Sequence, residues 1–146
     1  TDTLRNIERL KFNDKHIALD LDGHAGQTVK LLGLLLGKDQ ATNTTYVGVG
    51  LKLLDDGMNY EQLMSAALDV VLGANASSLS VVELIWNNLI GPPTPADNIG
   101  QYATLIDNGT YTSAGLAVIA ADHSLNTTAI DLVGLSQTGV EYIPYG

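Results

Sequence analysis

The sequence predicts a mainly α-helical domain: a short N-terminal β-hairpin followed by a compact bundle of about six to seven helices. Three observations predict it. Apolar residues alternate with polar ones near the start, they recur at helical spacing in the rest, and the helical part contains two related three-helix units. We place the hairpin, or the end of a β-roll, at residues 1–22 and the helical domain at residues 23–146. The repeat units span approximately residues 27–75 and 79–124, and a terminal helix and a tail follow.

Alternation in the first segment is typical of strands. Leu10 and Phe12 flank Lys11, and a second alternating run covers residues 17–21. The stretch 13–15 between them is rich in turn-forming residues. We therefore expect a β-hairpin or two edge strands.

The first unit contains three apolar stripes at helical spacing, and each predicts one helix packed against a common core. The stripes consist of Val29, Leu32 and Leu36; of Val47, Gly50, Leu51 and Leu54; and of Tyr60, Leu63, Met64, Ala67, Leu68 and Val71.

The second unit repeats this scheme. Residues 53–57 (Leu-Leu-Asp-Asp-Gly) recur as residues 105–109 (Leu-Ile-Asp-Asn-Gly), and the pair Leu36-Gly37 has a counterpart in Ile90-Gly91. The glycines of these motifs stand where helices are expected to end. The stripes consist of Val81, Leu84, Ile85 and Leu89; of Ile99, Tyr102, Ala103 and Ile106; and of Leu116, Ile119 and Ala120. A last helix carries Ile130 and Val133, and an extended tail closes the chain.

Composition excludes several classes of function. The 146 residues carry a formal charge of −9 with only seven Lys and Arg, which argues against binding to nucleic acid. The sequence contains no Cys, so disulfides, thiolate catalysis and Cys-based zinc sites are impossible. The longest apolar run, residues 31–36, is too short for a transmembrane segment.

One short motif has the residues of a cation site. Asp20 and Asp22 precede Gly23, as at the start of a calcium loop, where alternating oxygen ligands and a glycine bend converge on one hard cation. The sequence thus makes Asp20 and Asp22 candidate calcium ligands. The alternative is a strand-to-helix turn in which Asp22 is the N-cap.

A second group of residues suggests binding of a glycan or small molecule. Trp86, Asn87, Asn88 and Tyr102 could provide aromatic and carboxamide contacts, although Trp86 and Tyr102 at helical spacing also suit packing in a core. A hydrolase using paired carboxylates ranks third, because the spacing brings no two acids together.

Two segments resemble parts of secreted bacterial proteins. Residues 2–14 (Asp-Thr-Leu-Arg-Asn-Ile-Glu-Arg-Leu-Lys-Phe-Asn-Asp) resemble the segment that closes the calcium-binding nonapeptide β-roll of repeats-in-toxin proteins. Residues 19–27 resemble the junction into a tandem helical family of unknown function near the C-termini of type I-secreted proteins. Further matches are Leu36-Gly37-Lys38-Asp39, Tyr46 and Leu54-Asp55-Asp56-Gly57 in the first unit, and Ile90-Gly91-Pro92-Pro93-Thr94-Pro95, Tyr102 and Ile106-Asp107-Asn108-Gly109 in the second.

This resemblance implies a non-catalytic accessory module at the C-terminal end of a secreted or cell-surface bacterial protein. Such a module would help in export, folding, anchoring or assembly, with the secretion machinery or the cell-surface matrix as partner and calcium as a possible cofactor. No catalytic residues are implied, and the sequence does not specify an oligomeric state.

Overall fold

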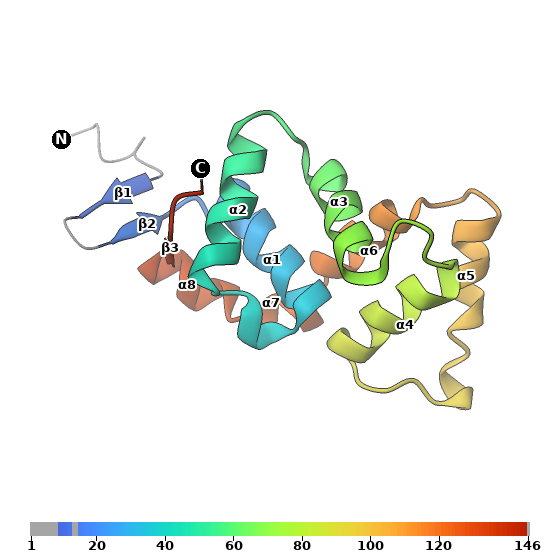
Figure 1. Cartoon of the computed structure of the whole chain (residues 1–146). Coiled ribbons are helices and arrows are strands. Elements are labelled where there is room, and N and C mark those ends of the chain that lie inside the picture. The colour runs from blue at the N-terminus through green and yellow to red at the C-terminus, as the bar shows by residue number, and fades with distance from the viewer. Residues whose placement is uncertain (1–8, 13–14, 146) are drawn as a thin grey trace.

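The structure is a computed structural model that describes residues 9–12 and 15–145, and it confirms the mainly α class with an N-terminal β-hairpin (Figure 1). The described residues form three short strands, eight α-helices and two 3₁₀ helices. In chain order these are β1 (Arg9–Lys11), β2 (His16–Ala18), α1 (His24–Leu36), η2 (Lys38–Gln40), α2 (Thr44–Asp55), α3 (Tyr60–Leu72), α4 (Ser78–Leu89), η3 (Pro95–Asp97), α5 (Gly100–Asp107), α6 (Ser113–Ala121), α7 (Ser124–Ala129), α8 (Leu132–Thr138) and β3 (Val140–Tyr142).

The strands form one antiparallel sheet in the order β1-β2-β3. Ile17 lies in its middle, opposite Leu10 of β1 and Glu141 of β3. The predicted hairpin is thus confirmed, although residues 1–8, 13 and 14 of that segment lie outside the described part. The tail is extended as expected, and β3 at its start adds a third strand to the sheet by pairing with β2.

Both predicted units contain three α-helices with a 3₁₀ helix after the first. The repeated motif ends α2 in one unit and α5 in the other. Gly57 (φ 115°) and Gly109 (φ 84°) each follow the helix end in the left-handed region that favours glycine. The third helix then begins at an N-cap whose side chain accepts a backbone N–H, Asn59 for α3 and Thr112 for α6.

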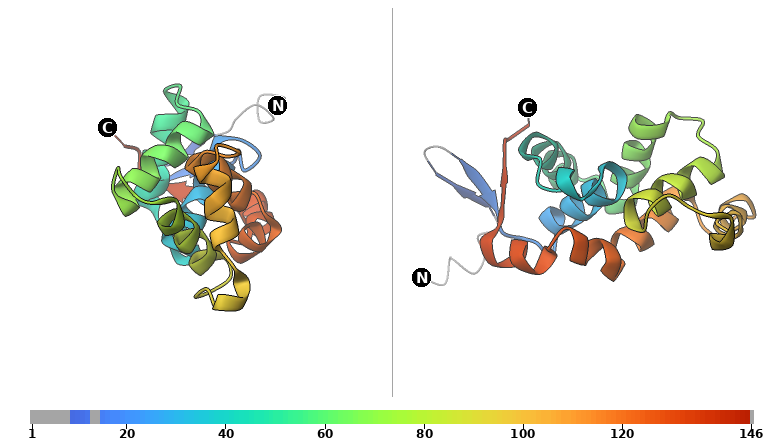
Figure 2. Two further views of the ribbon diagram at one scale, coloured as in Figure 1. Left: turned by 90° about the vertical axis from the view of Figure 1, so that its right-hand side faces the viewer. Right: turned by 90° about the horizontal axis from the view of Figure 1, so that it is seen from below.

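The two units pack against each other through their first and third helices. Within each unit the first helix contacts the second and the third; between them α1 contacts α4 and α6, and α3 contacts the same two helices. The four-helix core is therefore α1, α3, α4 and α6, with α2 and α5 outside it. The sheet lies at one end of the molecule and α5 at the other (Figures 1 and 2). Leu34, Leu35 and Met64 are among the largest fully buried side chains.

The single terminal helix that the sequence predicts is two helices. Asp131 has a left-handed backbone (φ 56°) and caps α8 by accepting the N–H of Gly134, so the chain turns between α7 and α8. In α7, buried Asn126 donates from Nδ2 to the carbonyls of Lys30 (3.0 Å) and Ala121 (2.8 Å). This amide fastens the C-terminal segment to α1 and α6.

Candidate functional site

Asp20, one of the two candidate calcium ligands, is bound within the fold. Its side chain is buried, one carboxylate oxygen accepts from the Arg9 guanidinium, and the other accepts the backbone N–H of Ala25 at 3.2 Å. Arg9 also donates to both oxygens of Asp55 at 3.0 and 3.3 Å, and His24 Nδ1 lies 2.7 Å from the same carboxylate. Asp20 therefore joins the sheet to the start of α1.

Asp22 is exposed and does not cap α1. The N-cap position belongs to Gly23, and the carboxylate that satisfies an N–H of the first turn is that of Asp20. The expectation of Asp22 as N-cap is therefore wrong, since Asp20 reaches past it to Ala25. No group of three or more His, Asp or Glu side chains suited to a metal ion occurs in the described residues. Calcium binding by Asp20 and Asp22 stays a prediction.

The residues proposed for glycan binding are used in different ways. The rings of Trp86 and Tyr102 pack on each other with centroids 5.7 Å apart and planes tilted by 38°. Asn88 donates from Nδ2 to the carbonyl of Leu34 at 2.7 Å and so binds α4 to α1, whereas Asn87 is exposed. The aromatic pair thus packs within the second unit, and one of the two amides serves the contact between the units.

The indole nitrogen of Trp86 is buried and finds no hydrogen-bond partner among the described residues. Asp97 in η3 lies close enough for the indole to influence its carboxylate, although the two groups form no hydrogen bond. The backbone N–H of Thr94 lowers the pKa of Asp97 below its ordinary value, and the Thr94 hydroxyl and the Trp86 indole act in the same direction. Asp97 therefore remains a carboxylate in mildly acidic solution.

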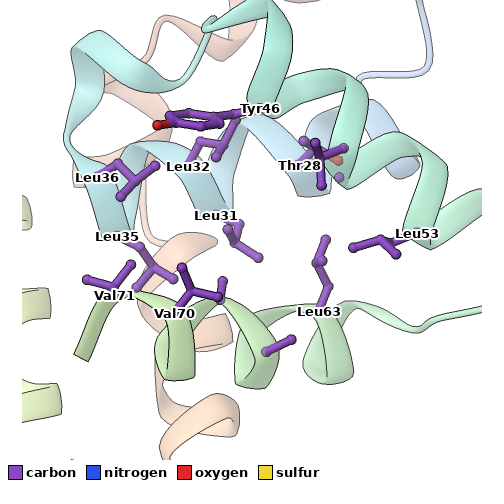
Figure 3. A pocket seen from close by; sticks show the side chains of 14 residues that line it. Thr28, Leu31, Leu32, Leu35, Leu36, Tyr46, Leu53, Leu63, Val70 and Val71 are labelled. Carbon is purple, nitrogen blue, oxygen red and sulfur yellow. The ribbon is translucent and has the colours of Figure 1, made fainter. Parts of the chain in front are cut away.

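A concave feature lies between the three helices of the first unit, and we call it groove 1 (Figure 3). Its volume is about 370 Å³. Apart from the hydroxyls of Thr28 and Tyr46, the lining consists of hydrocarbon side chains and one glycine. The lining residues are Thr28, Leu31, Leu32, Leu35 and Leu36 of α1; Tyr46, Val49, Gly50 and Leu53 of α2; and Leu63, Ala66, Ala67, Val70 and Val71 of α3.

The rim of groove 1 is apolar and open to solvent. Val70 is 86% exposed, Tyr46 46% and Leu36 40%. The Thr28 hydroxyl is engaged with the carbonyl of His24 at 2.9 Å, so it offers no free donor to a bound molecule. Groove 1 can therefore bind an apolar group by contact and shape, and the Tyr46 hydroxyl is the one further polar side-chain group of its lining.

A second hollow, groove 2, lies between α4, α5, α6 and the start of α7, with a volume of about 270 Å³. It is also largely apolar, but it contains the Trp86–Tyr102 pair. Its lining residues are Val82, Ile85, Trp86, Leu89, Ile90, Tyr102, Leu116, Ile119, Ala120, His123 and Leu125.

Comparison with known proteins gives no relative: no family model, curated protein or solved structure matches this chain. None of the described helices has both the length and the apolar composition needed to cross a membrane. Sequence reasoning missed groove 1. One residue could have indicated it: Val70 is apolar but lies beside the predicted apolar stripe of α3, on the part of the helix where polar residues are expected.

Proposed function

We propose that this chain is a non-catalytic accessory module of a secreted or cell-surface protein and that it acts by binding an apolar group of a partner in groove 1. The observation that carries the proposal is the groove itself, whose lining and exposed rim are both apolar. Contiguous apolar surface of this kind marks binding sites on small domains. The acidic chain, with a formal charge of −9, makes nucleic acid an unsuitable partner.

A fluorescent probe tests the binding function. N-phenyl-1-naphthylamine is uncharged and its emission rises in apolar surroundings, so titration of the wild-type chain should give a saturable rise. Ala66→Ile places three further carbons in groove 1, and we expect the Kd of the probe to rise about tenfold or more. Ala129→Ile is the matched control, since Ala129 is exposed at the end of α7. No saturable binding, or equal binding by both variants, contradicts the proposal.

The secreted or cell-surface setting, with the secretion machinery or the surface matrix as partner, is supported by the sequence resemblance. Fractionation of the source cells with an antibody against this chain tests it. Signal in the medium or on intact cells supports the setting, whereas signal confined to the cell interior contradicts it.

Calcium association belongs to the same proposal. A calcium ion at Asp20 would have to replace the guanidinium of Arg9, so binding competes with an existing ion pair. Thermal melting with calcium and with the same concentration of magnesium tests it. A rise in Tm specific to calcium supports Asp20 and Asp22 as ligands, and equal melts remove them.

A further inference from the structure

The walls that the first and third helices supply to the two grooves correspond in the internal repeat. Aligning the ends of the first helices, Leu36-Gly37 with Ile90-Gly91, places every α1 residue of groove 1 opposite an α4-segment residue of groove 2. The pairs are Thr28 and Val82, Leu31 and Ile85, Leu32 and Trp86, Leu35 and Leu89, and Leu36 and Ile90. The internal repeat has therefore duplicated a hollow as well as a set of helices.

The third helices agree with this correspondence. Aligning the N-caps Asn59 and Thr112 matches four of the five α3 residues of groove 1 with residues of groove 2. These pairs are Leu63 and Leu116, Ala66 and Ile119, Ala67 and Ala120, and Val70 and His123. At two of the paired positions the side chain is larger in groove 2, where Trp86 stands opposite Leu32 and Ile119 opposite Ala66. Groove 2 is correspondingly smaller, about 270 Å³ against about 370 Å³.

Each groove also has a tyrosine from its outer helix, at positions that do not correspond in the repeat. In groove 2 the Tyr102 ring packs on Trp86 at 5.7 Å. In groove 1 Tyr46 is half exposed beside Leu32 (Figure 3), and among the described residues its ring has no aromatic neighbour. Groove 1 thus has a tyrosine and the larger volume of the two, while the aromatic partner that Tyr102 has in Trp86 of groove 2 is absent from its lining.

We infer that groove 1 receives an aromatic side chain from a peptide segment of a partner protein, in the place that Trp86 takes in groove 2. This inference rests on the proposed function and specifies its ligand. Aromatic rings bury a large apolar area at little entropic cost and are the usual anchors of protein interfaces. A peptide segment suits the groove better than a free small molecule, because the rim at Leu36, Tyr46 and Val70 is itself apolar and exposed, so the residues that flank the ring can pack against it. The lining also lacks the placed polar groups by which sites recognise small molecules.

The first test compares two blocked amino acids, N-acetyl-tryptophanamide and N-acetyl-leucinamide, by NMR titration of the wild-type chain. We expect the tryptophan derivative to bind groove 1 with a Kd about three- to tenfold lower. Equal or reversed affinities overturn the inference. Free indole is the third ligand, and tighter binding of indole than of the blocked tryptophan assigns the site to a small aromatic compound and also overturns it. If N-phenyl-1-naphthylamine binds while no aromatic preference is found, the proposed function stands and only this inference fails.

A reciprocal pair of substitutions gives the second test. Leu32→Trp supplies groove 1 with the residue of groove 2 and should abolish binding of N-acetyl-tryptophanamide, while Trp86→Leu should open groove 2 and add a second site. Undiminished binding by folded Leu32→Trp contradicts the inference. If that variant does not fold, Ala66→Ile, which also takes its residue from groove 2, replaces it. We expect sedimentation of the wild-type chain to give a monomer. A dimer that Ala66→Ile dissociates would show instead that a second copy of the chain fills groove 1, and would overturn the inference.

Discussion

The amide of Asn126 offers the sharpest test of how the C-terminal segment is held. The side chain is 3% exposed, and both of its described hydrogen bonds end on main-chain carbonyls, one in α1 and one at the end of α6. Asn126→Ala removes two hydrogen bonds and leaves a small cavity. At about 0.5 to 1.5 kcal/mol for each bond, with the cavity added, we expect a loss of roughly 2 to 4 kcal/mol in the free energy of unfolding.

Asn126→Asp keeps the shape but turns a donor into a carboxylate that faces two carbonyl oxygens. An unpaired buried charge costs about 3 to 5 kcal/mol, so this variant should be the less stable of the two at neutral pH. Burial raises the pKa of the introduced carboxyl, and the protonated form can donate again. Its deficit relative to Asn126→Ala should therefore shrink as the pH falls.

Urea denaturation followed by the fluorescence of Trp86, the single tryptophan, measures these differences. Exposed Asn87 is the control, and Asn87→Ala should remain within about 0.5 kcal/mol of wild type. If Asn126→Ala proves as stable as Asn87→Ala, or if the Asp variant equals wild type at neutral pH, the amide does not fasten α7 to α1 and the reasoning is refuted.

Two further predictions concern the tail and one half-buried tyrosine. A Cβ on Gly48 would lie 1.8 Å from the carbonyl oxygen of Ile143, so Gly48→Ala should displace the tail and lower the free energy of unfolding by roughly 1 to 3 kcal/mol in urea denaturation. Gly100 is the control, because a Cβ there would lie in open space and Gly100→Ala should be neutral or slightly stabilising. Equal effects of the two substitutions would contradict the contact between Gly48 and the tail. Burial, and then the nearby Asp122 carboxylate, raise the pKa of Tyr60 above its ordinary value of 10.0, so the unfolded chain loses this proton first and stability falls as the pH rises through about 10. Tyr60→Phe should lose less stability than wild type between about pH 9 and 11, and parallel curves from urea denaturation would show that Tyr60 does not contribute.

The helical stripes were readable from the sequence because helix periodicity and helix ends are local properties. The segments around Leu32, Leu51 and Leu68 form the three helices of the first unit as predicted, and the repeated Asp-Asp-Gly and Asp-Asn-Gly motifs end α2 and α5. Burial of α1 follows from its run of leucines.

Features that depend on distant parts of the chain were not readable. The pairing of Glu141 with Ile17 requires the tail to return to the first hairpin, and nothing in its own residues indicates that partner. The left-handed residue at the turn between α7 and α8 is Asp131, and no glycine or proline stands there to indicate a turn. Similarly, the Asp20 carboxylate accepts the N–H of Ala25 in the first turn of α1 from five residues away, a contact that the local sequence does not indicate.

Groove 1 was hidden for a related reason. A stripe of apolar residues predicts that a helix face is covered, but not by what. In the structure Leu31 and Leu35 are buried as the stripe predicts, yet they line a hollow whose rim at Val70 stays exposed (Figure 3). The comparison of the two units, in which Leu32 of groove 1 stands opposite Trp86 of groove 2, shows that groove 1 lacks an aromatic side chain at this position.

The most direct test of the account is to locate a bound apolar group by methyl NMR. Titration with N-phenyl-1-naphthylamine should shift the methyl signals of Leu31, Leu35 and Val71, which line groove 1, and leave those of Val82 and Leu116 in groove 2 unchanged. Shifts confined to groove 2, or no shifts at saturating probe, would contradict the claim that the first unit holds the binding site.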